Sequence, residues 1–422
     1  MSTACSDDAG DPAFTDTGGS LEIDGCGYSI ATRLGAEPPR KATDTRGEDP
    51  TPRQVHLGFV GDPKTSIVAQ WRTKDETTRE TVIRYGVGED LAPEALTEKK
   101  TGIQFGYRST GAQIYRVHQA HLCGLEPGTA YSYQVGSEGA FSPVYTFRTA
   151  PDVAASPDAE VVIGFVGDSR NGYDVWSQLV TQFRQRTPDL ILFSGDAVTL
   201  GIGQLEWEEF FDRAEPLFAR APVISAHGNH EGNSVNYYSQ FPMPGDQENF
   251  SFDFGHAHLT VANDTPEDPG VITGSTRDKL EADFEASKGA RWRMLMNHQA
   301  FWSSAQSHGS SLTLQQAWMP LVDKYKLDLV LNGHDHEYEI SRPLVGGVPQ
   351  ASNKDATVYV VGGGAGAELY DIGVGTIGFR AYAEKTYSAA VVRVTRNALE
   401  LDAFRPDGSP ISAPEARFSK TK

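Results

Sequence analysis

The sequence has little positive charge, few cysteines and no long apolar run. No stretch approaches the roughly 18 consecutive apolar residues of a transmembrane helix, so we expect none. Lys and Arg together number 37 against 56 Asp and Glu, which gives a formal net charge of −19 at pH 7. Clustered Lys and Arg bind nucleic-acid backbones, and we therefore expect no nucleic-acid-binding surface. The three cysteines lack the spacing of a zinc finger, which excludes a thiolate site of that kind.

The cysteines instead indicate the cellular compartment of the protein. The segment STACS resembles the end of a bacterial lipoprotein signal; in that interpretation Cys5 carries a lipid anchor, and otherwise it lies in a plain N-terminal tail. Cys26 and Cys123 could form a disulfide in an oxidising compartment, or they could be two unrelated buried thiols. These features predict a bacterial protein outside the cytoplasm, either secreted, periplasmic or lipid-anchored at the cell surface.

Composition divides the chain into three parts. Residues 1–51 are rich in Gly, Asp, Thr and Pro, and are predicted to be a flexible tail. Residues 52–150 contain short alternating apolar runs separated by turn signals such as LEPGTA, a pattern typical of a β-sandwich. The strands around Trp71 and Tyr131 look like the core of a fibronectin type III-like domain.

The third part, residues 151–422, alternates apolar strands with helix-like segments. This alternation predicts an α/β domain with mixed sheets, layered αββα. Five of its strands end in polar groups, which are GD at 167–168, GD at 195–196, GNHE at 228–231, NH at 297–298 and GHDH at 333–336. In α/β sheets the ligand site lies outside the carboxyl ends of the strands, so we expect these five loops to converge.

The five loops carry carboxylate, amide and imidazole donors, which are Asp168, Asp196, Asn229, His230, His298, His334 and His336. Such donors suit borderline or hard ions such as Fe, Zn or Mn. Seven donors exceed one tetrahedral site, and two ions about 3.5–4 Å apart with a bridging carboxylate fit the set better. A single Gly-Asp after a strand is a common turn, but five such strand ends in order are improbable by chance.

The series GD, GD, GNHE, H and GHDH resembles the calcineurin-like metallophosphoesterases, and among them most closely the purple acid phosphatases. PRQVHLGFVGDPKTSIVAQWRT is similar to that family's N-terminal fibronectin-like domain, and the resemblance covers roughly residues 52–410. It implies two metal ions, of Fe, Zn or Mn, and a phosphate ester as substrate. The ligands that it implies are the bridging Asp196, with Asp168 and His336 at metal one and Asn229, His298 and His334 at metal two.

The resemblance also implies roles for residues that do not bind metal. His230 lies beside the substrate, where it stabilises phosphoryl charge or protonates the leaving group. His308 matches a substrate-facing histidine of the family, the alternative being an exposed loop histidine. Glu231 could orient the His230 imidazole.

The sequence departs from the family at metal one. Purple enzymes carry a tyrosinate three residues after the bridging Asp, where this chain has Thr199. Other members of the superfamily carry a histidine two residues after the first Asp, where this chain has Arg170. Three alternatives follow. Tyr173 replaces the missing ligand, or water completes metal one, or metal one is weak or absent.

Arg170 itself has two interpretations. A guanidinium near the phosphate can bind two of its oxygens at once, which makes Arg170 a catalytic residue. The alternative is a structural salt bridge to Asp174 or another acidic neighbour.

Together these patterns predict a phosphomonoesterase in which a metal-bound hydroxide attacks phosphorus. One alternative is a phosphodiesterase acting on nucleotide or phospholipid diesters. A second alternative is a cell-surface binding protein whose metal site has degenerated, because neither usual metal-one ligand is present.

Overall fold

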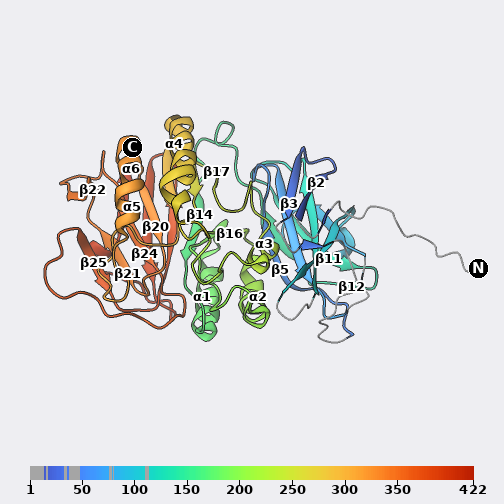
Figure 1. The fold of residues 1–422 in the computed structure, drawn as a ribbon. Helices are drawn as coiled ribbons and strands as arrows, with labels where there is room; N and C mark the ends of the chain where they lie inside the picture. The colour runs from blue at the N-terminus through green and yellow to red at the C-terminus, as the bar shows by residue number, and fades with distance from the viewer. Residues whose placement is uncertain are drawn as a thin grey trace, which may run out of the picture.

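The computed structural model describes residues 14–15, 18–32, 36–37, 48–75, 78, 80–109 and 114–422. The predicted lipid anchor at Cys5 lies outside these residues. In Figure 1 the blue and cyan strands form one end of the molecule, and the green to red elements form the rest. Among the helices described, none combines the length and the apolar character needed to cross a membrane.

The first domain is a sandwich of two antiparallel sheets. Its strands are β4 (Ala36–Glu37), β5 (Arg53–Gly58), β6 (Ser66–Arg72), β7 (Val82–Val87), β8 (Glu98–Thr101), β9 (Ile103–Arg108), β10 (Ile114–Cys123), β11 (Ala130–Ser137), β12 (Ala140–Phe141) and β13 (Tyr145–Arg148). One sheet has the order β4-β9-β10-β6-β5; the other has the order β12-β11-β7-β8, with β13 also paired to β11. Trp71, Tyr131 and Tyr133 are buried in the shared core, as the alternating pattern predicts.

Part of the predicted tail is ordered on this sandwich. Short β1 (Phe14–Thr15) pairs with β2 (Gly18–Ile23), which pairs with β3 (Tyr28–Thr32). A disulfide joins Cys26 to Cys123 of β10, and the Tyr28 hydroxyl lies 2.8 Å from His121 Nδ1. The expectation of a flexible tail over 1–51 is therefore wrong for these strands, because a covalent link and a half-buried tyrosine fix a segment whose composition alone indicates disorder.

The second domain contains two mixed sheets. The first has the order β16-β15-β14-β26-β27-β28, with β14 (Val161–Val166), β15 (Leu190–Phe193), β16 (Val223–Ser225), β26 (Ala389–Val394), β27 (Ala398–Phe404) and β28 (Phe418–Thr421). The second has the order β17-β18-β19-β20-β24-β21-β25, with β17 (Phe250–Phe254), β18 (Ala257–Val261), β19 (Trp292–Met296), β20 (Leu329–Asn332), β21 (Tyr338–Ser341), β24 (Val358–Gly362) and β25 (Arg380–Glu384). A small hairpin pairs β22 (Leu344–Val345) with β23 (Val348–Pro349).

Six α-helices of the described residues belong to this domain, which are α1 (Tyr173–Arg186), α2 (Gln204–Phe218), α3 (Val235–Gln240), α4 (Arg277–Ala286), α5 (Leu312–Ala317) and α6 (Met319–Tyr325). Side chains alternate between the two faces of the second sheet. On β20, Leu329 and Leu331 enter the core shared with the first sheet, whereas Val330 packs with α4 and α6. This alternation produces the αββα layers that the sequence predicts, and α1 and α2 lie together in Figure 1, away from α4.

Buried ion pairs join the sandwich to α2. Glu208 of α2 binds both Arg53 of β5 and Arg72 of β6, and the Arg72–Glu208 pair is nearly inaccessible to solvent. Tyr107 of β9 donates to Gln204, the first residue of α2, at 2.6 Å. Because α2 follows directly after the loop that contains Asp196, the sandwich fixes the helix that ends this loop.

His258 of β18 connects the edge of the second sheet to α4. Its Nδ1 lies 2.8 Å from Asp253 Oδ1, and its Nε2 lies 3.3 Å from Asp283 Oδ2. Burial acts to lower the pKa of His258, but hydrogen bonds to the two carboxylates outweigh it and raise the pKa to about 9.

A pH-dependent contribution to stability follows from this shift. An unfolded histidine titrates near a pKa of about 6.5, so His258 contributes fully below that pH and progressively less as the pH rises through 9. We predict that His258→Gln lowers the free energy of unfolding near pH 6, and that the difference from wild type shrinks toward about pH 10. Urea unfolding at both pH values measures this. An equal deficit at both would contradict the assignment.

Candidate metal centre

The polar strand ends converge at one point between the two sheets. Two groups of donor atoms lie there, each with all atoms within 4.8 Å of one another; they are Asp196, His298 and His334, and Asp168, Asp196 and His336. Asp196 belongs to both groups, which is the position that a bridging carboxylate requires. Carboxylates and imidazoles so arranged fit borderline metal ions.

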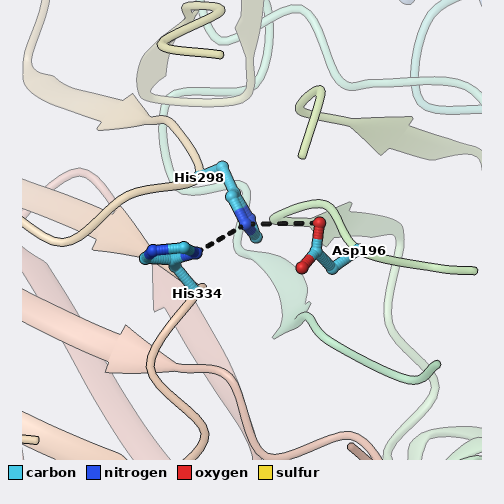
Figure 2. A group of neighbouring side chains, drawn as sticks. All are labelled: Asp196, His298 and His334. Atoms are coloured by element: carbon cyan, nitrogen blue, oxygen red, sulfur yellow. Dashed lines mark hydrogen bonds and ion pairs between the residues drawn. The ribbon is translucent and has the colours of Figure 1, made fainter. Parts of the chain in front are cut away.

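The metal-two group is shown in Figure 2, where His298 lies between Asp196 and His334. His298 Nε2 lies 3.3 Å from Asp196 Oδ1 and 3.2 Å from His334 Nδ1. The same nitrogen lies 3.0 Å from Asn229 Oδ1. Four predicted ligands therefore present their donor atoms to one small volume.

The backbone fixes which imidazole nitrogen is available to an ion. His298 Nδ1 donates to the Ser194 carbonyl at 2.7 Å, and His336 Nδ1 donates to the Glu368 carbonyl at 2.7 Å. In both residues Nε2 is the nitrogen that faces the site. Contacts of this kind are typical of histidine ligands, because they fix the tautomer and the ring orientation. Burial acts to lower the pKa of His298, but the charge and hydrogen bond of Asp196 raise it, so an incoming ion displaces a proton from His298 Nε2.

The ionisation of His334 and of Asp196 also suits metal binding. Burial, followed by the charges of neighbouring histidines, lowers the pKa of His334 to about 2, so that its imidazole is neutral. Burial acts to raise the pKa of Asp196, but the charge and hydrogen bond of His298 lower it below its ordinary value. A neutral imidazole and an ionised carboxylate are the forms that bind metal.

The close approach of the loops depends on two glycines. A Cβ on Gly228 would lie 2.3 Å from Asp196 Oδ1, and a Cβ on Gly333 would lie 2.4 Å from Asp168 Oδ2. The ligand backbones are themselves unusual, with φ of 63° at Asp168, 57° at Asp196 and 70° at His334. Left-handed backbone at non-glycine residues is strained and clusters at functional sites.

The metal-one group fits an ion less well than the metal-two group does. It has three donor residues, and Arg170 lies against two of them. Arg170 Nε is 3.6 Å from Asp196 Oδ2, and its Nη2 is 3.4 Å from His336 Nε2. The predicted alternative of a salt bridge to Asp174 is wrong, because Asp174 is exposed and pairs with Arg213; the acidic neighbour is Asp196.

Tyr173 does not join the centre. It is the first residue of α1, and its hydroxyl donates to the Ala197 carbonyl at 3.1 Å. Burial raises its pKa further above the ordinary value, which opposes the tyrosinate form that a metal ligand needs. The structure therefore does not support Tyr173 as a replacement ligand.

Glu231 was expected to orient the His230 imidazole, but the two side chains bind different groups. His230 Nδ1 donates to the Thr199 carbonyl at 2.8 Å, and its Nε2 faces Asp196 Oδ2 at 3.8 Å. Glu231 does not orient this imidazole. Its carboxyl instead accepts from the backbone N–H groups of Asp196, Ala197 and Gly228, each at 2.8 Å. Burial, followed by the charge of Asp196, raises the pKa of Glu231 to about 8.

His308 lies beside the centre, with its ring centroid 4.1 Å from that of His334. Its Nε2 is 3.4 Å from the hydroxyl of Tyr370, whose ring stacks on His336 at 4.1 Å. Tyr370 was not predicted, because it lies in the loop between β24 and β25, which has no distinctive pattern. Asp264 was also missed; it is buried and accepts from the His298 backbone N–H at 3.3 Å.

Family models match both domains of the chain. Residues 52–149 match the purple acid phosphatase N-terminal domain, and residues 161–338 match the calcineurin-like phosphoesterase domain. The second match ends two residues after His336, so it includes every predicted metal ligand.

Similar proteins occur in bacteria, plants and mammals. An uncharacterized protein of Mycobacterium tuberculosis is 26% identical, covering 74% of this chain and 69% of that protein. Acid phosphatase type 7 of Mus musculus is 26% identical, covering 75% of this chain and 78% of that protein. Purple acid phosphatase 22 of Arabidopsis thaliana is 24% identical, covering 72% of this chain and 71% of that protein.

A solved structure shares the fold. The purple acid phosphatase from yellow lupin (Lupinus luteus) seeds superposes with a TM-score of 0.73 at 18% identity, covering 88% of this chain and 74% of that chain. The two domain matches and this arrangement agree with the sandwich and the αββα layers described above. The chain is a purple acid phosphatase-like member of the calcineurin-like metallophosphoesterases, and hence a metal-dependent phosphatase.

Proposed function

We propose that the chain hydrolyses phosphomonoesters at a centre for two ions of Fe, Zn or Mn. The observation that carries this proposal is the pair of donor groups that share Asp196, with His230 and Arg170 directed at the same carboxylate. The convergence of all six predicted ligand residues disfavours a degenerate binding protein. When bound, the ions would activate water and neutralise charge on the phosphate oxygens.

The protein side chains would bind and protonate the ester. Arg170 carries a permanent positive charge and can donate to the phosphate oxygens. His230 donates its Nδ1 hydrogen to Thr199, so its Nε2 is the atom that can hold a proton for the leaving oxygen. His308 lies at the exposed edge of the centre, where it can assist the same oxygen. Three groups of potential positive charge suit a monoester dianion better than a singly charged diester.

A cavity beside metal two could hold the organic part of the substrate. It has a volume of about 500 Å³ and adjoins Asn229. Asn233, Thr265 and Gln299 contribute polar atoms, and Leu314 contributes an apolar surface. All of the residues that line it lie in the described part of the chain, and they include no Lys or Arg. This lining supports an uncharged, hydrogen-bonding leaving group in preference to one with further phosphates.

We also propose that the protein works outside the cytoplasm. The disulfide between Cys26 and Cys123 supports this location, since such bonds persist in oxidising compartments.

His230 provides the test of the proposed proton donor. We predict that His230→Ala lowers kcat on p-nitrophenyl phosphate by about 10²–10⁴-fold, because a positioned acid is lost, while bound metal is retained. The matched control is His256→Ala, since His256 precedes β18 at the amino end of the sheet, opposite the centre, and contacts Pro157.

Parallel rates on bis(p-nitrophenyl) phosphate separate the two ester classes. A higher kcat/KM for the monoester supports the proposal. A higher value for the diester would replace it with the phosphodiesterase alternative. An unchanged kcat in His230→Ala would remove His230 from the mechanism.

The colour of the iron-loaded protein tests whether metal one lacks a tyrosinate ligand. Thr199 cannot act as a tyrosinate, and Tyr173 donates to a backbone carbonyl. We predict that iron-loaded protein shows no tyrosinate-to-iron charge-transfer band in the visible spectrum. A purple colour would contradict this and would direct attention to Tyr370, the phenol stacked on His336.

A further inference from the structure

The positively charged side chain of Arg170 lies among the donors of the metal-one group. The Arg170 side chain is largely buried, with 16% of its surface exposed, and among the described residues its Nε has no hydrogen-bond partner. The guanidinium lies 3.6 Å from Asp196 Oδ2 and 3.4 Å from His336 Nε2. Because His336 Nδ1 donates to Glu368, Nε2 is the acceptor in this contact. Arg170 therefore occupies the lone pair through which His336 would bind an ion.

Within the described residues, the metal-two group has no such competitor. Its donors meet at His298 Nε2, with Asn229 Oδ1 at 3.0 Å and His334 Nδ1 at 3.2 Å. In the described part of the chain, no Lys or Arg side chain is hydrogen bonded to Asn229, His298 or His334. Amide and imidazole donors together with one edge of the Asp196 carboxylate face this position.

We propose that Arg170 makes the two ion positions unequal, so that metal two binds its ion tightly and metal one binds weakly. The guanidinium replaces part of the positive charge that metal one supplies in the family. This inference deepens the proposed function, since it assigns half of the phosphate-binding charge to a side chain.

Electrostatics gives the direction and the scale of the effect. A guanidinium keeps its charge at every physiological pH, so it repels a divalent ion placed among the same donors. Like charges a few ångström apart weaken binding strongly in a buried site, and we expect a difference of at least about tenfold in affinity. The absence of the tyrosine or histidine ligand that relatives carry also weakens ion binding at metal one.

Manganese binding to the full chain tests the proposal. Metal-free protein is titrated with Mn²⁺ by calorimetry, and electron paramagnetic resonance distinguishes an isolated ion from a spin-coupled pair. We expect wild type to bind one Mn²⁺ tightly with the spectrum of an isolated ion, and a second at least about tenfold more weakly.

Substitutions at Arg170 separate charge from ligand supply. Arg170→Ala removes the charge, and we expect the second Mn²⁺ to bind at least about tenfold more tightly than in wild type. Arg170→His also adds a ligand at the position where the superfamily carries one, and should give the coupled-pair spectrum. Arg170→Lys keeps the charge and should keep the weak second position. Arg213→His, on the outer surface of α2, is the matched control and should behave as wild type.

Two results would overturn the proposal. One is wild-type protein that binds two Mn²⁺ with equal affinity, a measurement that needs no variant. The other is folded Arg170→Ala protein in which the second affinity is unchanged. Failure of the proposed function is a separate outcome, because metal binding as predicted without hydrolysis of p-nitrophenyl phosphate would reject only the monoesterase activity.

Discussion

The centre depends on two carboxylates that the fold buries almost completely. Asp168 and Asp196 are at most 1% exposed, at the point where the strands of both sheets end. A charged carboxylate at such a position is unstable unless positive charge and hydrogen bonds compensate it. Histidine imidazoles, the Arg170 guanidinium and backbone N–H groups surround the pair, and the metal ions of the family supply the remaining charge. Much of the local structure serves this compensation.

The loop after β15 shows how far that constraint extends. The Glu231 carboxyl accepts from the backbone N–H groups of Asp196 and Ala197 in this loop and of Gly228 in the loop after β16. These hydrogen bonds fix the backbone that carries Asp196. Thr199 then offers its carbonyl to His230, so one loop holds both the shared carboxylate and the proposed acid. The helix that follows is fastened to the sandwich through Glu208. The sandwich is thus part of the support of the centre, although it contributes no residue to the two donor groups.

The ligand positions were predictable because each follows an apolar strand directly. Once parallel strands are recognised, their carboxyl ends must meet, and Asp168, His298 and His336 come together for that reason. The hydrogen-bond partners of side chains next to the ligands were not predictable, because they depend on the path of the backbone. Glu231 stands next to His230 in sequence, yet the turn that contains both residues directs their side chains to different groups.

Local sequence was also a poor guide to the position of the Tyr173 side chain and to the structure of the predicted tail. Tyr173 begins a helix whose direction carries its hydroxyl to a backbone carbonyl, and only the fold reveals that direction. Tyr370 reaches the centre from a loop far along the chain, without a motif to mark it. The strands β2 and β3 owe their order to a disulfide partner 97 residues away in sequence, which local composition does not register.

The most direct test of the metal centre is a crystal structure of the Mn²⁺-loaded protein, with the ions located by anomalous diffraction. We predict a strong peak within bonding distance of Asp196, Asn229, His298 and His334, with the Arg170 guanidinium still facing Asp196. A peak remote from Asp196, or one between Asp168 and His336 with none beside His298, would contradict the assignment of the centre.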